Sequence, residues 1–266
     1  MTAVQVHSGT FRDAVAAEIM KVRTLRSTWA FLAGGVLATT LGAMILLLMV
    51  QSYDADSPAD RANYETADPT VVTMPFVMFF VGAIGAMLIT SEYTTRTLGP
   101  SLLAVPQRGV LFGAKAAVAG LIGFGGGAFF ALAAFAVARL TLGDRPAPFN
   151  PWPQWTDAVP TVLCATVVAG VTCLVALGLG ALTRSTAAAL TTLGGLVLVA
   201  PIFAHFLPVV WQLRLASVLL PNLTPQLAGS DHPYLLSQGG AVAVTAGYLV
   251  LALGAGALAF RRRDAA

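Results

Sequence analysis

Six long apolar segments constrain this chain more than any other feature of its sequence. They cover approximately residues 29–50, 71–89, 110–138, 159–182, 187–207 and 239–260. Each is close to the ~20 residues that a helix needs to cross the hydrocarbon core of a bilayer. Only 10% of the residues are charged, against roughly 25% in soluble domains. We therefore predict an all-α, polytopic membrane protein with six transmembrane helices.

The domain organisation follows from these segments. We expect residues 1–28 to form a tail and an amphipathic helix, and residues 29–266 to form one six-span membrane domain. The first span is too long for a cleavable signal peptide and has no small-residue cleavage site, so it should remain in the protein. The short polar gap at residues 183–186 predicts a tight hairpin between the fourth and fifth spans.

The distribution of Lys and Arg predicts the orientation. One side of the predicted topology holds Arg12, Lys21, Arg23, Arg26, Arg96, Arg108, Lys115, Arg184, Arg261, Arg262 and Arg263. The other side holds only Arg61, Arg139, Arg145 and Arg214. Cytoplasmic loops carry the excess of basic residues. We therefore expect a multi-pass protein of the bacterial cytoplasmic membrane with both termini in the cytoplasm.

The spans lack the groups on which membrane chemistry depends. No Asp, Glu or Lys falls in the middle of a predicted span, whereas ion-driven pumps and intramembrane metalloproteases need such groups. The histidines, His7, His205 and His232, are isolated in the sequence. Cys164 and Cys173 would lie roughly 13 Å apart along one helix and cannot bridge. We expect no catalytic residue, metal or cofactor in this chain.

The stretch from Gly109 to Lys115 looks like a phosphate-binding loop but departs from that motif. The motif needs four residues between its glycines and Lys directly after the second. Here three residues separate Gly109 from Gly113, and Ala114 precedes Lys115. We interpret Lys115 as a basic anchor near the cytoplasmic end of the third span. Any energy for transport must then come from another chain.

One polar stretch precedes the first predicted span, and another separates the second span from the third. In residues 11–28, apolar Phe11, Val15, Ile19 and Val22 recur at helical spacing among basic residues, although Glu18 projects close to this stripe. The pattern predicts a helix at the cytoplasmic face, with a solvated helix or a simple basic anchor as the alternative. The second stretch, SEYTTRTL at residues 91–98, continues through Gly99-Pro100 to PQRG at 106–109. It is either a solvated loop or a lever for an external motor.

These two stretches carry a family resemblance. AEIMKVRTLRSTW at 17–29 and SEYTTRTLGPSLLAVPQRGVLFGAK at 91–115 resemble permease subunits of bacterial type-2 ATP-binding-cassette exporters, and the six-span pattern extends the resemblance over nearly the whole chain. It implies that the first stretch is an elbow helix and that the second docks on a nucleotide-binding subunit. It also implies short re-entrant or interfacial helices within residues 208–237. The elbow-helix candidates are Phe11, Val15, Ile19, Lys21, Arg23 and Arg26.

The candidates for coupling to the ATPase come from the second stretch. Glu92, Tyr93 and Thr97 match family positions, as do Pro106, Arg108 and Lys115. Arg96 joins them by spacing alone, because it could pair with Glu92 four residues earlier for ~0.2–0.5 kcal/mol. With so small a structural contribution, Glu92→Ala and Arg96→Ala should impair transmission without unfolding the protein. Gly99-Pro100 departs from the family pattern, so we expect a helix break at Gly99 and a restart at Pro100.

The function implied by the resemblance is that of an exporter permease. It would bind no cofactor itself, while a partner ATPase would bind ATP and Mg²⁺. Its partners would be two ATPase subunits, a second copy or a similar permease, and the bilayer, but no nucleic acid. A membrane anchor or assembly factor without transport activity is the alternative. An intramembrane enzyme is disfavoured by the missing catalytic residues.

Overall fold

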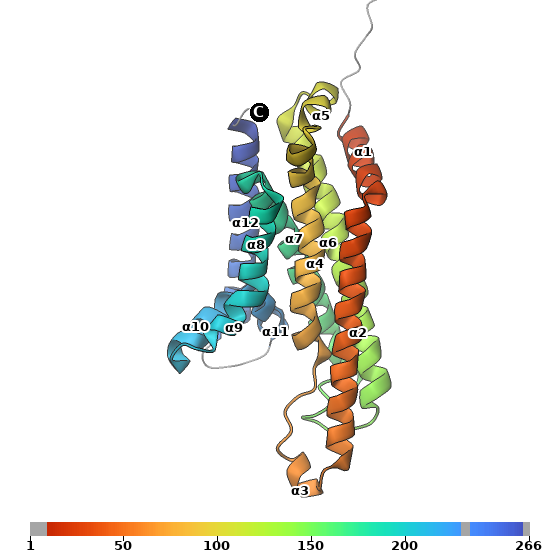
Figure 1. The fold of residues 1–266 in the computed structure, drawn as a ribbon. Helices are drawn as coiled ribbons and strands as arrows, with labels where there is room; N and C mark the ends of the chain where they lie inside the picture. The colour runs from red at the N-terminus through yellow and green to blue at the C-terminus, as the bar shows by residue number, and fades with distance from the viewer. Residues whose placement is uncertain (1–9, 230–234, 263–266) are drawn as a thin grey trace, which may run out of the picture.

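A computed structural model describes residues 10–229 and 235–262 of the chain (Figure 1). The helices are α1 (Phe11–Thr24), α2 (Arg26–Ala55), α3 (Pro58–Arg61), α4 (Pro69–Thr95), α5 (Leu98–Ala104), α6 (Arg108–Leu142), η1 (Trp155–Ala158), α7 (Val159–Thr183), α8 (Thr186–Gly194), η2 (Gly195–Val199), α9 (Ala200–Ala204), α10 (Val209–Val218), η3 (Leu220–Asn222), α11 (Leu223–Leu227) and α12 (Gln238–Arg262). No strand occurs in these residues. The all-α prediction is confirmed.

Within the described residues, six helical segments are long and apolar enough to cross a membrane, which confirms the predicted number. They are α2, α4, α6, η1 with α7, α8 through α9, and α12. The third is the longest: the 35 residues of α6 span about 52 Å. This exceeds a hydrocarbon core of about 30 Å. Helix α6 therefore projects beyond the bilayer or tilts within it.

The bundle is built around α4 and α7, whose apolar windows are the most deeply buried of the six spans. Helix α7 packs against α4, α6 and α12. Small residues allow this close packing: a Cβ atom on Gly123 of α6 would lie 2.7 Å from Cβ of Cys173 and 2.9 Å from Cα of Gly170, both on α7. Cys173 is buried in this contact and Cys164 is half-buried. The two do not bridge each other, as predicted, and both are free thiols.

The fifth span is irregular. The predicted hairpin is present, because α7 ends at Thr183, Arg184 takes a left-handed conformation (φ 53°), and α8 begins at Thr186. A single π-helical turn, Gly195–Val199, then separates α8 from α9. The short helices α10, η3 and α11 follow, in the segment where the resemblance implies such helices. In Figure 1, α9 and α10 project sideways from the bundle at the left.

Two sequence predictions about helix boundaries are wrong in detail. Helix α1 ends at Thr24 and Leu25 is extended, so Arg26 begins α2 instead of continuing the elbow helix. The break after α4 lies at Arg96, whose left-handed conformation (φ 57°) ends that helix. Helix α5 then runs through Gly99 and Pro100. Proline is tolerated there because a first-turn N–H has no partner within the helix.

Candidate functional site

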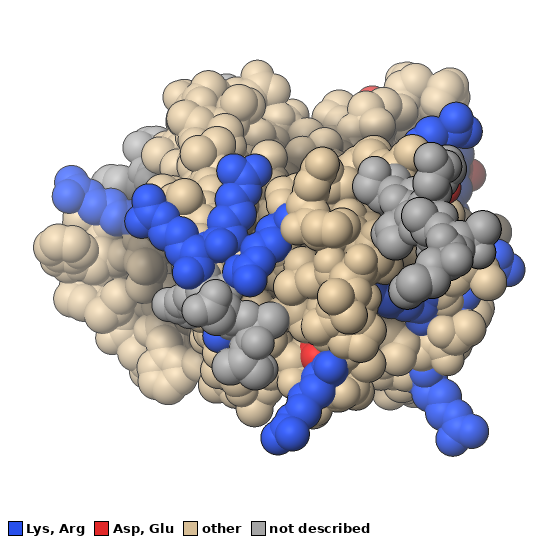
Figure 2. Space-filling model, turned by 90° about the horizontal axis from the view of Figure 1, so that it is seen from above, with Lys and Arg blue, Asp and Glu red and all other residues tan. Residues whose placement is uncertain are grey.

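The second polar stretch forms a helical connection at one end of the bundle. Helix α4 ends, the chain turns at Arg96, and α5 leads through residues 105–107 into α6. Figure 1 places α5, α1 and the end of α12 together at the top. We call this the basic end, because Figure 2, which views it directly, shows many Lys and Arg side chains and few Asp or Glu.

The coupling candidates predicted from the sequence occupy different environments at this end. Arg96, Thr97 and Pro106 are exposed. Half-buried Tyr93 carries the Arg184 guanidinium over its ring, 5.3 Å from the centroid. Nη1 of Arg108 donates to the carbonyl oxygen of Arg261 over 3.3 Å, which ties the start of α6 to the end of α12. These candidates share one face of the molecule but do not form one site.

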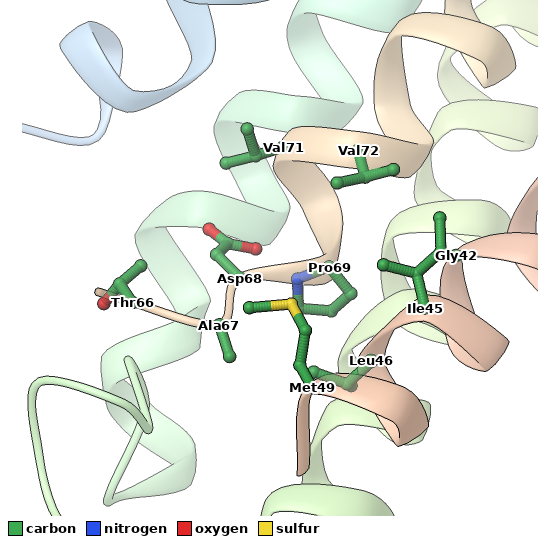
Figure 3. A pocket seen from close by; sticks show the side chains of 10 residues that line it. All are labelled: Gly42, Ile45, Leu46, Met49, Thr66, Ala67, Asp68, Pro69, Val71 and Val72. Carbon is green, nitrogen blue, oxygen red and sulfur yellow. The ribbon is translucent and has the colours of Figure 1, made fainter. Parts of the chain in front are cut away.

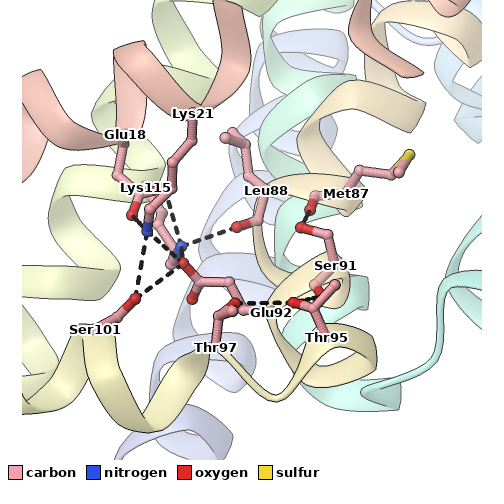
Figure 4. Close-up of polar contacts among 10 residues, drawn as sticks. All are labelled: Glu18, Lys21, Met87, Leu88, Ser91, Glu92, Thr95, Thr97, Ser101 and Lys115. Carbon is pink, nitrogen blue, oxygen red and sulfur yellow. Dashed lines mark hydrogen bonds and ion pairs between the residues drawn. The ribbon is translucent and has the colours of Figure 1, made fainter. Parts of the chain in front are cut away.

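Glu92 lies instead in a cluster of four charged side chains, which we call the buried charge cluster: Glu18, Lys21, Glu92 and Lys115 (Figure 4). Nζ of Lys115 lies 3.0 Å from Oε2 of Glu18 and 2.9 Å from Oε1 of Glu92. Nζ of Lys21 lies 2.8 Å from Oε1 of Glu18 and 2.5 Å from Oε1 of Glu92. Two cations and two carboxylates therefore alternate in one ring of ion pairs.

Three helices supply this cluster. Glu18 and Lys21 come from α1, Glu92 from the last turn of α4, and Lys115 from the third turn of α6. Nζ of Lys115 also donates to the carbonyl oxygen of Leu88 on α4 over 2.9 Å. A helix that stays outside the spans is thereby joined to two that run through the bundle.

Burial distinguishes this cluster from an ordinary surface network. Lys115 is 0% exposed, Glu18 1% and Glu92 4%. Only Lys21 reaches solvent; burial lowers its pKa, but hydrogen bonds to Glu18 and Glu92 outweigh this and leave the pKa raised. Buried ions depend on their partners, so removing one partner typically costs about 3–5 kcal/mol.

Helix α5 contacts the cluster through Ser101. Its hydroxyl oxygen lies 3.4 Å from Nζ of Lys21 and 3.4 Å from Oε1 of Glu92. A pocket of about 280 Å³ opens beside these groups, with Glu18, Lys21, Ser101 and Val105 in its wall. The other carboxylate oxygen of Glu92, Oε2, is buried without a hydrogen-bond partner in the described part of the chain. Movement of α5 would therefore disturb the ion pairs directly.

Two interpretations of single residues are corrected here. Lys115 is not an anchor that reaches toward solvent, because its side chain is fully buried and paired with two carboxylates. Glu92 pairs with Lys21 and Lys115 instead of Arg96, because α4 ends at Thr95 and the turn carries Arg96 away from the helix face.

Sequence reasoning missed Glu18 and Ser101. A signal for Glu18 was present: the buried residues of α1 are Ala14, Glu18 and Val22, four apart, so the carboxylate lies within the buried stripe. A buried carboxylate is normally paired with a cation. Lys115, a lysine inside an apolar segment, was therefore a possible partner for Glu18. Of the predicted apolar stripe, Val15 and Ile19 pack against the core, but Phe11 is 49% exposed. Nothing in the sequence pointed to Ser101.

The cluster carries no evident reaction chemistry. Its charges are already paired and it contains no nucleophile with an adjacent base. Within residues 10–229 and 235–262, no group of three or more His, Cys, Asp or Glu side chains could hold a metal ion. Of the three histidines, His7 and His232 lie outside the described residues. The arrangement fits a mechanical link between helices.

Comparison with known proteins does not assign the chain to a family. No protein-family model matches it, and no curated protein matches it.

Proposed function

We propose that this chain is the membrane-spanning permease subunit of a bacterial ATP-binding-cassette exporter, driven by a separate ATPase that docks at the basic end. One observation carries the proposal: α5, the helix that would receive the motor, contacts a buried charge cluster shared by α1, α4 and α6. The six spans and the two stretches that resemble exporter permeases support it.

The proposed mechanism uses the cluster as a stiff joint. A push on α5 reaches Ser101 and then Glu92, and the ion pairs pass it to α1 and α6. Because each cluster carboxylate is almost fully buried, separating the pairs costs more than moving the helices together. The three helices then shift as one body when the ATPase closes on ATP, as packed elements do in switching transitions.

The orientation belongs to the same proposal. With the basic end in the cytoplasm, the excess of Lys and Arg lies on the side that the positive-inside rule requires. Both termini of the described chain approach that side, because α1 and the end of α12 lie at the basic end (Figure 1). The protein would act in the cytoplasmic membrane as a pair of permeases with two ATPases.

The test is a single change on the exposed face of α5. Leu103 is 80% exposed there, and an ATPase docked on this face would remove its apolar side chain from water. Co-expression with the ATPase encoded nearest to this gene should yield a complex that copurifies. Leu103→Asp should lower the copurified ATPase about tenfold or more, since the interface would then bury a carboxylate without a partner.

Leu140 supplies a matched control. It is 85% exposed near the opposite end of α6, so Leu140→Asp adds the same charge far from the proposed docking face. The control should leave the complex intact. If no ATPase copurifies with the unaltered chain, or if both variants behave alike, the exporter proposal fails and a non-transporting anchor or assembly factor becomes the better hypothesis.

A further inference from the structure

A second polar site lies at the end of the bundle opposite the buried charge cluster. There the start of α4 meets α7, η3 and α11 around a pocket of about 110 Å³. Its wall contains Asp68, Thr70, Val71, Met74, Pro75, Thr161, Pro221, Asn222, Thr224 and Pro225. A neighbouring pocket on the α2 side, drawn in Figure 3, shares Asp68 and Val71 with it. Asp68 therefore stands between two hollows at this end.

Asp68 supplies the negative charge. It precedes α4 as its N-cap, and Oδ1 accepts from the backbone N–H and the hydroxyl of Thr70 over 2.7 and 2.6 Å. No cation pairs with it in the described part of the chain. Burial raises the pKa of Asp68, although the bonds from Thr70 act in the opposite direction. Figure 3 shows the carboxylate pointing away from Leu46 and Met49.

Thr224 supplies an unused hydroxyl. The residue is 5% exposed, and its Oγ1 atom is buried without a hydrogen-bond partner among the described residues. Buried Thr172 and Thr245 donate to the carbonyl four residues earlier, whereas the hydroxyl of buried Thr90, like that of Thr224, has no partner among the described residues. A buried hydroxyl without a partner costs about 1–3 kcal/mol. Thr224 lines the pocket, so a ligand that reached Oγ1 through a rotation of this side chain would recover that cost.

The chemistry of the wall selects the ligand. A carboxylate without a paired cation disfavours anions and attracts a cation. The hydroxyl of Thr224 can accept a hydrogen bond. It therefore favours binding of an ammonium ion with N–H donors over a quaternary ammonium ion, which has none. The volume of about 110 Å³ lies below the roughly 300–1,000 Å³ of pockets for drug-sized ligands, so the pocket suits a small group. Apolar Val71, Met74 and the prolines suit the carbon atoms next to the charge.

We propose that this pocket binds a primary ammonium group, with Asp68 as its counter-ion and Oγ1 of Thr224 as a hydrogen-bond acceptor. The ammonium group could belong to the headgroup of an aminophospholipid or to a free aliphatic amine in solution. The site is independent of the exporter proposal, because it requires neither an ATPase nor transport.

The experiment uses the full chain in lipid nanodiscs and follows its melting temperature. Discs of phosphatidylcholine are the baseline, against discs containing phosphatidylethanolamine and against phosphatidylcholine discs with added ethanolamine. At least one amine source should raise the melting temperature. A response to the lipid alone assigns the headgroup, and a response to free ethanolamine alone assigns a soluble amine. If neither amine stabilises the protein, the proposal is overturned.

Three variants locate the effect. Asp68→Asn keeps an N-cap oxygen for Thr70, since Asn caps helices as well as Asp, but it removes the charge. Thr224→Val keeps the shape and removes a hydroxyl that makes no bond in the described chain. Each should lower the affinity for the amine about tenfold, the equivalent of one charge-assisted hydrogen bond. The rise in melting temperature should then require about ten times more amine. Glu65→Gln, an exposed carboxylate of the same loop, should respond as the unaltered protein does. An undiminished response in Asp68→Asn would contradict the assignment.

Discussion

Nζ of Lys115 lies 2.9 Å from Oε1 of Glu92, and both side chains are almost completely buried where α6 crosses the end of α4. The contact unites a lysine that the sequence suggested to be a membrane anchor with a glutamate that it suggested to be an exposed part of a lever. Each needs the other, because an unpaired ion at this depth would be strongly destabilising. The Lys115–Glu92 pair therefore changes what substitution of Glu92 should do.

Glu92→Ala should destabilise the protein by about 3 kcal/mol or more, because it leaves Lys115 and Lys21 with one carboxylate between them. The sequence alone led us to expect normal folding with impaired transmission. Thermal unfolding followed by helicity in detergent measures the effect. Arg96→Ala is the control: Arg96 is exposed, so its loss should stay within about 0.5 kcal/mol. Equal stability of the two variants would contradict the buried arrangement.

Lys115→Met and Glu92→Gln should show strong coupling. Each single change leaves an unbalanced charge, whereas the double variant keeps Glu18 and Lys21 as a neutral pair. The double variant should lose less stability than the sum of the single losses, by about 1–3 kcal/mol. The same unfolding measurements complete this double-mutant cycle. Additive losses would show that the Lys115–Glu92 contact contributes nothing.

Gly178→Ala should destabilise the bundle by about 1–3 kcal/mol, the usual cost of overpacking. A Cβ on Gly178 of α7 would meet the carbonyl oxygen of Ala252 on α12. Gly254 is the matched control on α12, because nothing lies within 4 Å of a Cβ there. Gly254→Ala should be neutral or stabilising by about 0.5–1 kcal/mol, since Ala favours the helix. If Gly254→Ala destabilised the protein more than Gly178→Ala in unfolding measurements, Gly178 would not lie in the α7–α12 contact.

Reporter fusions test the proposed orientation. Fusions after Arg61 and after Arg145 should report an external location, because these residues lie in the connections opposite the basic end. A fusion at the carboxyl terminus should report the cytoplasm, as the excess of Lys and Arg at the basic end requires. A cytoplasmic signal after Arg61 would invert the orientation and remove α5 from the reach of a cytoplasmic ATPase.

Energy supply tests the proposed function. The purified chain alone should neither bind nor hydrolyse ATP, whereas the co-expressed complex should hydrolyse it at a rate that transported substrate increases. Binding of a labelled ATP analogue and phosphate release measure the two properties. Proton-driven transport by the isolated chain in vesicles would rule out the proposal.

The sequence by itself determined the class of this protein and the number of its spans. Apolar length is a property of one continuous segment, and a helix in a bilayer satisfies its own backbone, so no knowledge of neighbouring helices is needed. The same holds for the hairpin at Arg184 and the two unpaired cysteines, which depend on residues close together in the chain. Helix ends were less certain. We expected the helix to break at Gly99, because glycine adopts the left-handed conformation without strain, but it breaks at Arg96.

Only the tertiary structure decided which charges are paired. Glu18 and Lys115 are 97 residues apart in the sequence, and Lys21 and Glu92 are 71 apart. Whether such groups meet depends on how α1, α4 and α6 pack, which no local pattern encodes. The same is true of Asp68 and Thr224, which line one pocket from the N-cap of α4 and from α11. Buried charges in a membrane protein persist where packing supplies a partner, because the hydrocarbon around the bundle cannot solvate them.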